Sequence, residues 1–187
     1  MRPDDKDKII ITMLSEDPIV SQDEMAERAG LSQPSVAARV KKLREAGALD
    51  TLVGINPFRL SLQVAKVDVT TTNPSKVLTL FNECPYFLNG MIVSGKSNLT
   101  LFFAAERIST LEAIVDNHLR NLPDVTDVDF NMVIFPAKKM VMPVKLSWGK
   151  KEKCSHQVRG ACKSCEARRS EMCGGCPITG SEDGWFF

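Results

Sequence analysis

The sequence predicts an α+β protein with a winged helix-turn-helix head, a ferredoxin-like βαββαβ domain and a small cysteine-rich metal knuckle at the C-terminus. Three observations support this fold class. Apolar residues recur at helical spacings of three and four within the first 49 residues. Four strand-like segments and two helical ones then alternate up to residue 135. Five of the six cysteines lie in the last 34 residues. The predicted domains are residues 1–55, 56–146 and 147–187.

Composition restricts the class of protein. The chain has 187 residues, of which 43% are hydrophobic and 25% charged, as in ordinary globular domains. Its net charge is only +1, so any affinity for nucleic acid must come from a local basic patch or from a dimer that doubles it. No apolar run is long enough to span a membrane, and the first residues lack the apolar core of a signal peptide. We therefore expect a cytoplasmic protein without a membrane partner, in which thiols stay reduced.

Three helices are expected in the head. The first covers residues 6–15, with Asp4 or Asp5 as its cap. Ser21 and Glu24 form a capping-box pattern at the start of the second helix, and Gly30 supplies the turn that follows. Ser32 is the predicted N-cap of the third helix. The buried stripe of that helix consists of Val36, Val40 and Leu43, and Gly47 ends it.

This layout is that of a helix-turn-helix, whose second helix enters the major groove of double-stranded DNA. Polar residues at the start of that helix would meet base edges, and basic residues would meet phosphates. The candidate DNA-binding residues are Ser32, Gln33, Ser35, Arg39, Lys42 and Arg44. The alternative interpretation is an ordinary helical hairpin with a solvated basic face.

The second domain begins after a short strand pair or wing expected at residues 49–55 and a turn at Asn56-Pro57. Strands are predicted at residues 62–70, 87–94, 99–105 and 125–135, and helices at 75–82 and about 109–121. Ser109 and Glu112 form the expected capping box of the second helix. The βαββαβ order places both helices on one face of an antiparallel sheet. We expect the other face to be apolar and to pack against a second copy, giving a homodimer or higher oligomer.

Short motifs distributed along the chain carry a resemblance to a known family. They are Asp7-Lys8, residues 26–32, Val36, residues 39–43, residues 45–47, Asn56-Pro57, Gly95 and Leu122-Pro123. In this order and spacing, the chain resembles the Lrp/AsnC (feast/famine) transcription regulators over about three quarters of its length. The resemblance implies a DNA-binding dimer, often assembled further, and a second domain of the RAM type. It also implies a small-molecule effector, commonly an amino acid, near the turn between the second and third strands.

The turn that would hold this effector departs from the family pattern. The family usually has glycine, an acidic residue, any residue and aspartate, whereas this chain has Gly95, Lys96, Ser97 and Asn98. An amino-acid ammonium group would lose its counter-charge there, so an anionic ligand or no ligand is the more plausible expectation. Gly95 and Asn98 are also simply good turn residues.

The cysteine-rich tail predicts a metal site. Two Cys-x-x-Cys knuckles, separated by seven residues, can supply four thiolates in a tetrahedral arrangement. The expected ligands are Cys162, Cys165, Cys173 and Cys176, with Cys154 and His156 as further candidates. Zn²⁺ is the preferred metal. The proline after Cys176 and the extra thiol at Cys154 keep a [4Fe–4S] iron–sulfur cluster open as the alternative.

Three functions follow from these observations. The first is a sequence-specific transcription regulator, not an enzyme, whose metal site is structural or redox-sensing. The second is a metal- or tetrapyrrole-dependent redox protein or enzyme on the same scaffold, because the sirohaem decarboxylases form a branch of the family. That branch needs histidine and arginine contacts to a tetrapyrrole, and the only histidines of the chain are His118 and His156. The third is an assembly scaffold with weak, non-specific DNA affinity.

Overall fold

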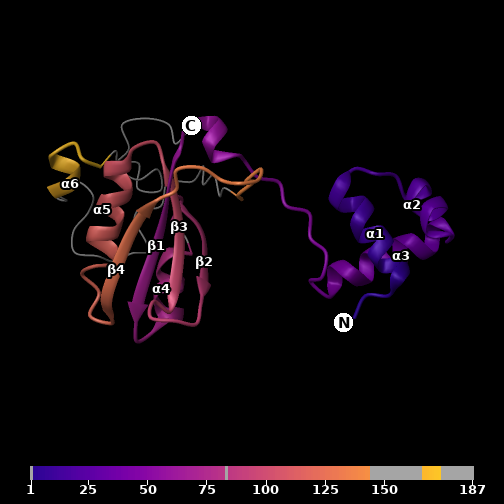
Figure 1. Cartoon of the computed structure of the whole chain (residues 1–187), viewed down its shortest axis with the longest axis horizontal. Helices are drawn as coiled ribbons and strands as arrows, with labels where there is room; N and C mark the ends of the chain where they lie inside the picture. Colours follow the sequence, from indigo (N-terminus) through magenta and orange to yellow (C-terminus); the bar gives the residue numbers. More distant parts are fainter. Residues whose placement is uncertain (1, 83, 144–165, 174–187) are drawn as a thin grey trace, which may run out of the picture. The chain divides into compact units, whose positions relative to one another are not determined.

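The computed structural model describes residues 2–82, 84–143 and 166–173 (Figure 1). The chain divides into two compact units, Met1–Val53 and Gly54–Phe187. The first unit contains three helices, α1 (Asp5–Glu16), α2 (Gln22–Ala29) and α3 (Gln33–Glu45). Their shared core includes Ile10, Met25 and Val36, each at most 2% exposed. The apolar stripes predicted for the head are therefore its buried faces.

Helix ends in the head follow the expected chemistry with two differences. Asp4 caps α1 in a full capping box with Asp7, and Gly30 ends α2 in the left-handed region at φ 61°. At α2, Ser21 Oγ accepts the Glu24 N–H at 3.1 Å, and among the described contacts only this half of the predicted box forms. Ser32 occupies the N-cap of α3 but makes no side-chain cap bond.

A strand pair or wing was expected at residues 49–55, and the described chain forms no strand pair within this segment. Within the described chain, Ile55 instead forms an isolated antiparallel bridge with Met142, through N–H···O bonds of 3.0 and 2.9 Å. A Cβ on Gly54 would lie 2.4 Å from the Met142 carbonyl oxygen, so glycine permits this close approach. The segment therefore pairs with a distant part of the chain rather than with itself.

The second unit contains a four-stranded antiparallel sheet with the order β2-β3-β1-β4 (Figure 1). The strands are β1 (Gln63–Thr71), β2 (Phe87–Ile92), β3 (Leu99–Ala105) and β4 (Val125–Met132). The helices are η1 (Pro57–Leu60), α4 (Pro74–Phe81), α5 (Ile108–His118) and the short α6 (Glu166–Arg169). This order confirms the predicted ferredoxin-like βαββαβ arrangement.

One face of the sheet carries the main core. Side chains of β1 and β3 pack there against α4 and α5, which confirms that both helices cover the same face. Phe103 lies at the centre, with its ring 5.0 Å from Phe81 and 5.6 Å from Phe87. Leu111, Ile114 and Val115 of α5 are buried against the sheet, as is Leu119 directly after the helix.

The opposite face of the sheet differs from the apolar surface that was expected. At one end Val64, Leu88 and Ala104 are covered by the chain itself, by Met142 and partly buried neighbours in residues 55–58. At the other end the face is polar, where Asp68 accepts hydrogen bonds from Lys66 and Thr100. The chain's own segments thus cover the apolar part, which removes much of the predicted need for external cover.

Two further boundaries were predicted wrongly. Helix α5 begins at Ile108 with Arg107 as its N-cap, so Ser109 lies inside the helix and its expected capping box with Glu112 does not form in the described chain. Strand β4 ends at Met132 rather than at the predicted residue 135, and Ile134 is 87% exposed. At β4 the apolar alternation of the sequence thus continues beyond the end of the strand.

Candidate nucleic-acid interface

The candidate DNA-binding residues of α3 lie on the side of the helix that faces away from the core. Val36, Val40 and Leu43 are buried, whereas Gln33, Lys42 and Arg44 are exposed. Ser35, Arg39 and Lys42 follow at helical spacings of four and three, so they lie along one side of the helix. The polar side chains therefore form a face that a partner can reach.

The start of α3 presents hydroxyl groups. Ser32 Oγ and Ser35 Oγ lie 2.8 Å apart and share a hydrogen bond, and the Ser32 side chain makes no cap bond to the backbone. Gln33 lies between them in sequence and is exposed. The first N–H groups of a helix lack intrahelical acceptors, so this end of α3 offers hydrogen-bond donors to a ligand.

The basic residues of α3 differ in how they are held. Lys41 Nζ lies 3.8 Å from the Glu45 carboxylate, and Arg44 reaches Thr51 Oγ at 3.5 Å. Among the described residues Lys42 forms no ion pair, and it is exposed. Lys42 is therefore the cation on this helix best placed to meet a phosphate.

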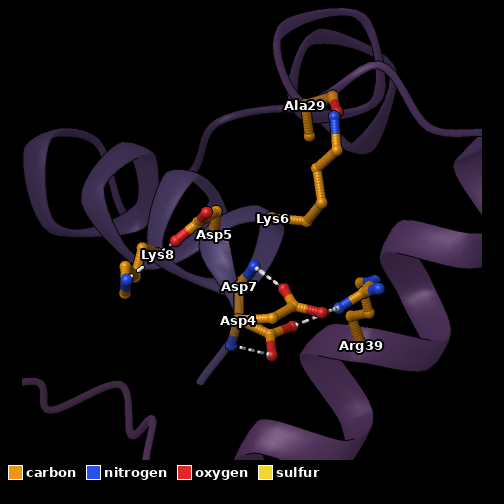
Figure 2. Close-up of polar contacts among 7 residues, drawn as sticks. All are labelled: Asp4, Asp5, Lys6, Asp7, Lys8, Ala29 and Arg39. Carbon is orange, nitrogen blue, oxygen red and sulfur yellow. Dashed lines mark hydrogen bonds and ion pairs between the residues drawn. The ribbon is translucent and has the colours of Figure 1, made fainter.

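Arg39 has a different environment. Its Nη1 donates to Asp4 Oδ2 at 2.8 Å and to Asp7 Oδ1 at 2.7 Å, and its side chain is 31% exposed (Figure 2). The Asp7 backbone N–H, followed by the Arg39 guanidinium, lowers the pKa of Asp4. The same two carboxylates raise the pKa of Arg39. Arg39 therefore forms ion pairs with two residues at the start of α1.

Sequence analysis missed this contact between α1 and α3. Asp4 was considered a helix cap, Asp7 part of a short motif and Arg39 a DNA ligand, and none of them was paired with another. The partners lie 35 and 32 positions apart in the chain, so no local periodicity connects them. The one available signal was a pair of acidic residues three apart at a helix start, which is also the signature of a cap.

An open cleft of about 440 Å³ lies beside this contact. It runs between the N-terminal end of α1 and the exposed side of α3. Its lining combines basic, acidic and hydroxyl groups, contributed by Arg2, Asp4, Asp7, Ser35, Ala38, Arg39 and Lys42. Lys42 and Arg2 supply the cationic part of this lining beyond the paired Arg39.

The predicted effector residues lie at the turn between β2 and β3. Gly95 has φ 138°, a conformation that favours glycine. Asn98 bonds to Thr71 twice, accepting from its N–H at 3.0 Å and donating to its carbonyl at 2.7 Å, and Thr70 Oγ donates to the Lys96 carbonyl at 3.1 Å. These contacts use the Asn98 side chain to attach the turn to the end of β1.

The expected metal ligands mostly lie outside the described residues. This applies to Cys154, His156, Cys162, Cys165 and Cys176. Cys173 is described and partly buried, and its backbone N–H donates to the Ala167 carbonyl at 2.9 Å, just after α6. In the described part of the chain there is no cluster of three metal-ligating side chains.

The remaining histidine and cysteine of the described chain are structural in placement. Cys84 is 6% exposed in the main core. His118 ends α5, and burial lowers its pKa to about 4. No helix among residues 2–82, 84–143 and 166–173 is long and apolar enough to cross a membrane.

Comparisons with known proteins agree with this arrangement. A family of winged helix-turn-helix DNA-binding domains matches residues 3–49. The chain is 28% identical over 129 residues to the HTH-type transcriptional regulator LrpA of Pyrococcus horikoshii, covering 67% of this chain and 92% of that protein. It is 24% identical over 145 residues to the transcriptional regulator AzlB of Bacillus subtilis, covering 74% and 92%. The structure of AsnC from E. coli matches with a TM-score of 0.65 at 14% identity, covering 75% of this chain and 98% of that one.

Proposed function

This chain belongs to the Lrp/AsnC family of DNA-binding transcription regulators, and from this premise we propose that it recognises a specific DNA sequence through α3. The observation that carries the proposal is the two-sided character of α3. One side is buried in the head, and the other exposes Gln33 and Lys42 near a hydroxyl pair. Amides read base edges in the major groove, and lysines bind phosphates as point charges.

The residues divide into two roles in this proposal. Ser32, Gln33 and Ser35 lie at the start of the helix, where they would face base edges. Lys42 and Arg44 lie about two to three turns further along and would bind the DNA backbone. The first group would decide sequence preference, and the second would set overall affinity and its salt dependence.

The test is selection of DNA from a random-sequence pool by the wild-type protein, followed by affinity measurements at several salt concentrations. Gln33→Ala should lose about 1–3 kcal/mol of discrimination at one base position. Lys42→Gln should weaken binding to every duplex and make the salt slope shallower by about 0.9. Failure of the wild-type protein to enrich any sequence would contradict the proposed function.

We also propose that the protein works as a homodimer or higher oligomer, because a helix-turn-helix usually reads two half-sites as a dimer. The partly polar outer face of the sheet in the second unit is the candidate contact surface. Analytical ultracentrifugation at assay concentration tests this, and a purely monomeric species would contradict it. An effector, if one binds near Gly95, Lys96, Ser97 and Asn98, should be anionic, since Lys96 replaces the acidic residue usual in the family.

For the tail, we propose a metal site formed by Cys162, Cys165, Cys173 and Cys176. The support is the spacing of two Cys-x-x-Cys pairs, which favours tetrahedral Zn²⁺, in a protein that we place in the reducing cytoplasm. The second candidate is a redox-sensing [4Fe–4S] cluster, supported by the proline after Cys176.

A UV–visible spectrum with metal analysis, on protein purified without oxygen, separates these metals. A colourless protein with about one zinc ion per chain would identify a structural tail. A brown protein with iron and sulfide would identify a redox-responsive regulator. Protein that contains neither zinc nor iron would contradict the proposed site.

A further inference from the structure

The first turn of α1 contacts both helices of the helix-turn-helix. Asp4 and Asp7 accept hydrogen bonds from Arg39 in α3 (Figure 2). On the other side of the same turn, Lys6 Nζ donates to the carbonyl of Ala29, the last residue of α2. Polar side chains of one helical turn thus connect α1 to the end of α2 and to the middle of α3.

Each aspartate divides its two oxygens between two tasks. Asp4 accepts the Asp7 N–H through Oδ1 at 2.8 Å and Arg39 through Oδ2. Asp7 accepts the Asp4 N–H through Oδ2 at 3.1 Å and Arg39 through Oδ1. The capping box of α1 is therefore also the receptor for the guanidinium.

The charges at this contact disfavour a phosphate. Two carboxylates face one guanidinium, so the net charge of these three groups is −1. The Asp7 side chain is only 12% exposed. A phosphate approaching Arg39 would meet two nearby carboxylates and would have to replace one of them as a partner. Such replacement leaves a partly buried carboxylate without its charge partner, which is costly.

We propose that Arg39 is a positioning residue, which sets the orientation of α3 through Asp4 and Asp7 and makes no contact with DNA phosphate. This inference rests on the proposed DNA-binding function and reassigns one residue that sequence analysis placed among the DNA contacts. Lys42, three positions further along α3, then supplies the phosphate contact on this side of the helix.

The chain offers matched variants. Asp4→Asn keeps the Oδ1 acceptor of the cap but replaces the oxygen that receives Arg39. Asp5→Asn removes the same charge from the same turn, but its side chain is 92% exposed and pairs with Lys8. Arg39→Lys keeps the positive charge but replaces the guanidinium, whose Nη1 donates to both carboxylates, with the ammonium of a shorter side chain. Lys42→Gln serves as the phosphate-contact control.

Each full-length variant is titrated with a duplex enriched by the wild-type protein and with a duplex of unrelated sequence, across a range of salt. The ratio of the affinity for the enriched duplex to the affinity for the unrelated duplex reports the orientation of α3. Partial unfolding would instead weaken binding to both duplexes equally. Asp4→Asn and Arg39→Lys should lower this ratio about tenfold, and Asp5→Asn should leave it unchanged. The salt slope of Arg39→Gln on the unrelated duplex should equal that of the wild-type protein.

Three results would overturn the proposal. A slope shallower by about 0.9 in Arg39→Gln, as expected for Lys42→Gln, would make Arg39 a phosphate contact. Tighter binding with a steeper slope in Asp4→Asn than in Asp5→Asn would show that the carboxylates mask such a contact. An unchanged affinity ratio in Arg39→Lys and Asp4→Asn would show that the contact of Arg39 with the two aspartates contributes only to folding stability. Absence of any sequence preference in the wild-type protein would instead reject the proposed function.

Discussion

His118 is a residue whose burial makes the stability of the second unit depend on pH. Its pKa is lowered from 6.5 to about 4 by desolvation, so it is neutral in the folded chain at pH 7. As pH falls from about 6.5 to about 4, the unfolded chain binds this proton before the folded chain does. The free energy of unfolding should therefore decrease over that window, by at most about 3 kcal/mol.

Urea unfolding of wild-type protein and His118→Gln, at about pH 7 and about pH 4.5, measures this effect. The free energy of unfolding of His118→Gln should decrease less between these two pH values than that of the wild-type protein. Asp4 and Asp68 have pKa values below 3.8, so their contributions are present above that pH and are lost only below the window. Equal losses in both proteins would mean that His118 is solvated in the folded state.

Phe103 belongs to the aromatic cluster in the core of the second unit. It is 1% exposed and packs edge-on against Phe81 at 5.0 Å. Phe103→Ala should reduce the free energy of unfolding by about 3–5 kcal/mol because it leaves a cavity in a closely packed core. Phe135→Ala removes the same ring from a position that is 82% exposed, and should change stability by less than about 0.5 kcal/mol. Denaturant unfolding compares the two variants.

At the scale of elements, Asn98 connects the β2–β3 turn to β1. Its amide both accepts from and donates to the backbone of Thr71, and its own N–H donates to the Val69 carbonyl at 3.1 Å. Asn98→Ala should cost about 1–3 kcal/mol, because it leaves backbone groups at the end of β1 without their partners. Ser94→Ala, an exposed change at the same turn, is the control for the urea measurement. Equal urea midpoints for Asn98→Ala and Ser94→Ala would show that water replaces the contacts of the Asn98 side chain.

The same contacts bear on regulation. A ligand that recruited the Asn98 side chain would have to break its bonds to Thr71. Ligand binding at this turn would therefore have an energetic cost to overcome, which is consistent with the proposed preference for an anionic ligand at Lys96 or for none.

At the scale of the whole molecule, the head and the proposed metal site should be separable. The head has its own core around Ile10, Met25 and Val36 within the unit Met1–Val53. Cys162→Ser should therefore lose bound metal, while far-UV circular dichroism changes little and DNA affinity remains. Cys84→Ala, which removes a thiol from the sheet core, should keep the metal. Full metal content in Cys162→Ser would show that the proposed ligand set is wrong.

Local pattern was sufficient for most of the fold. The spacing of Val36, Val40 and Leu43 predicts α3 and its buried face, because a helix repeats every 3.6 residues. The alternation of Val67, Asp68 and Val69 predicts β1 and its two faces for the corresponding reason. Gly30 predicts the turn between α2 and α3, since only glycine enters the left-handed region without cost. These features depend on residues close together in the chain, so the sequence by itself determined them.

Tertiary structure decided what depends on distant partners. Arg39 looks like a DNA ligand on its own helix, yet Asp4 and Asp7 reach it from 35 and 32 positions away. Residues 49–55 look able to pair with one another, yet Ile55 pairs with Met142. Ile134 continues a strand pattern but lies beyond the end of β4 and is 87% exposed in the described chain. The physical reason is the same in each case: charge pairing, backbone pairing and burial act between surfaces that only the folded chain brings together.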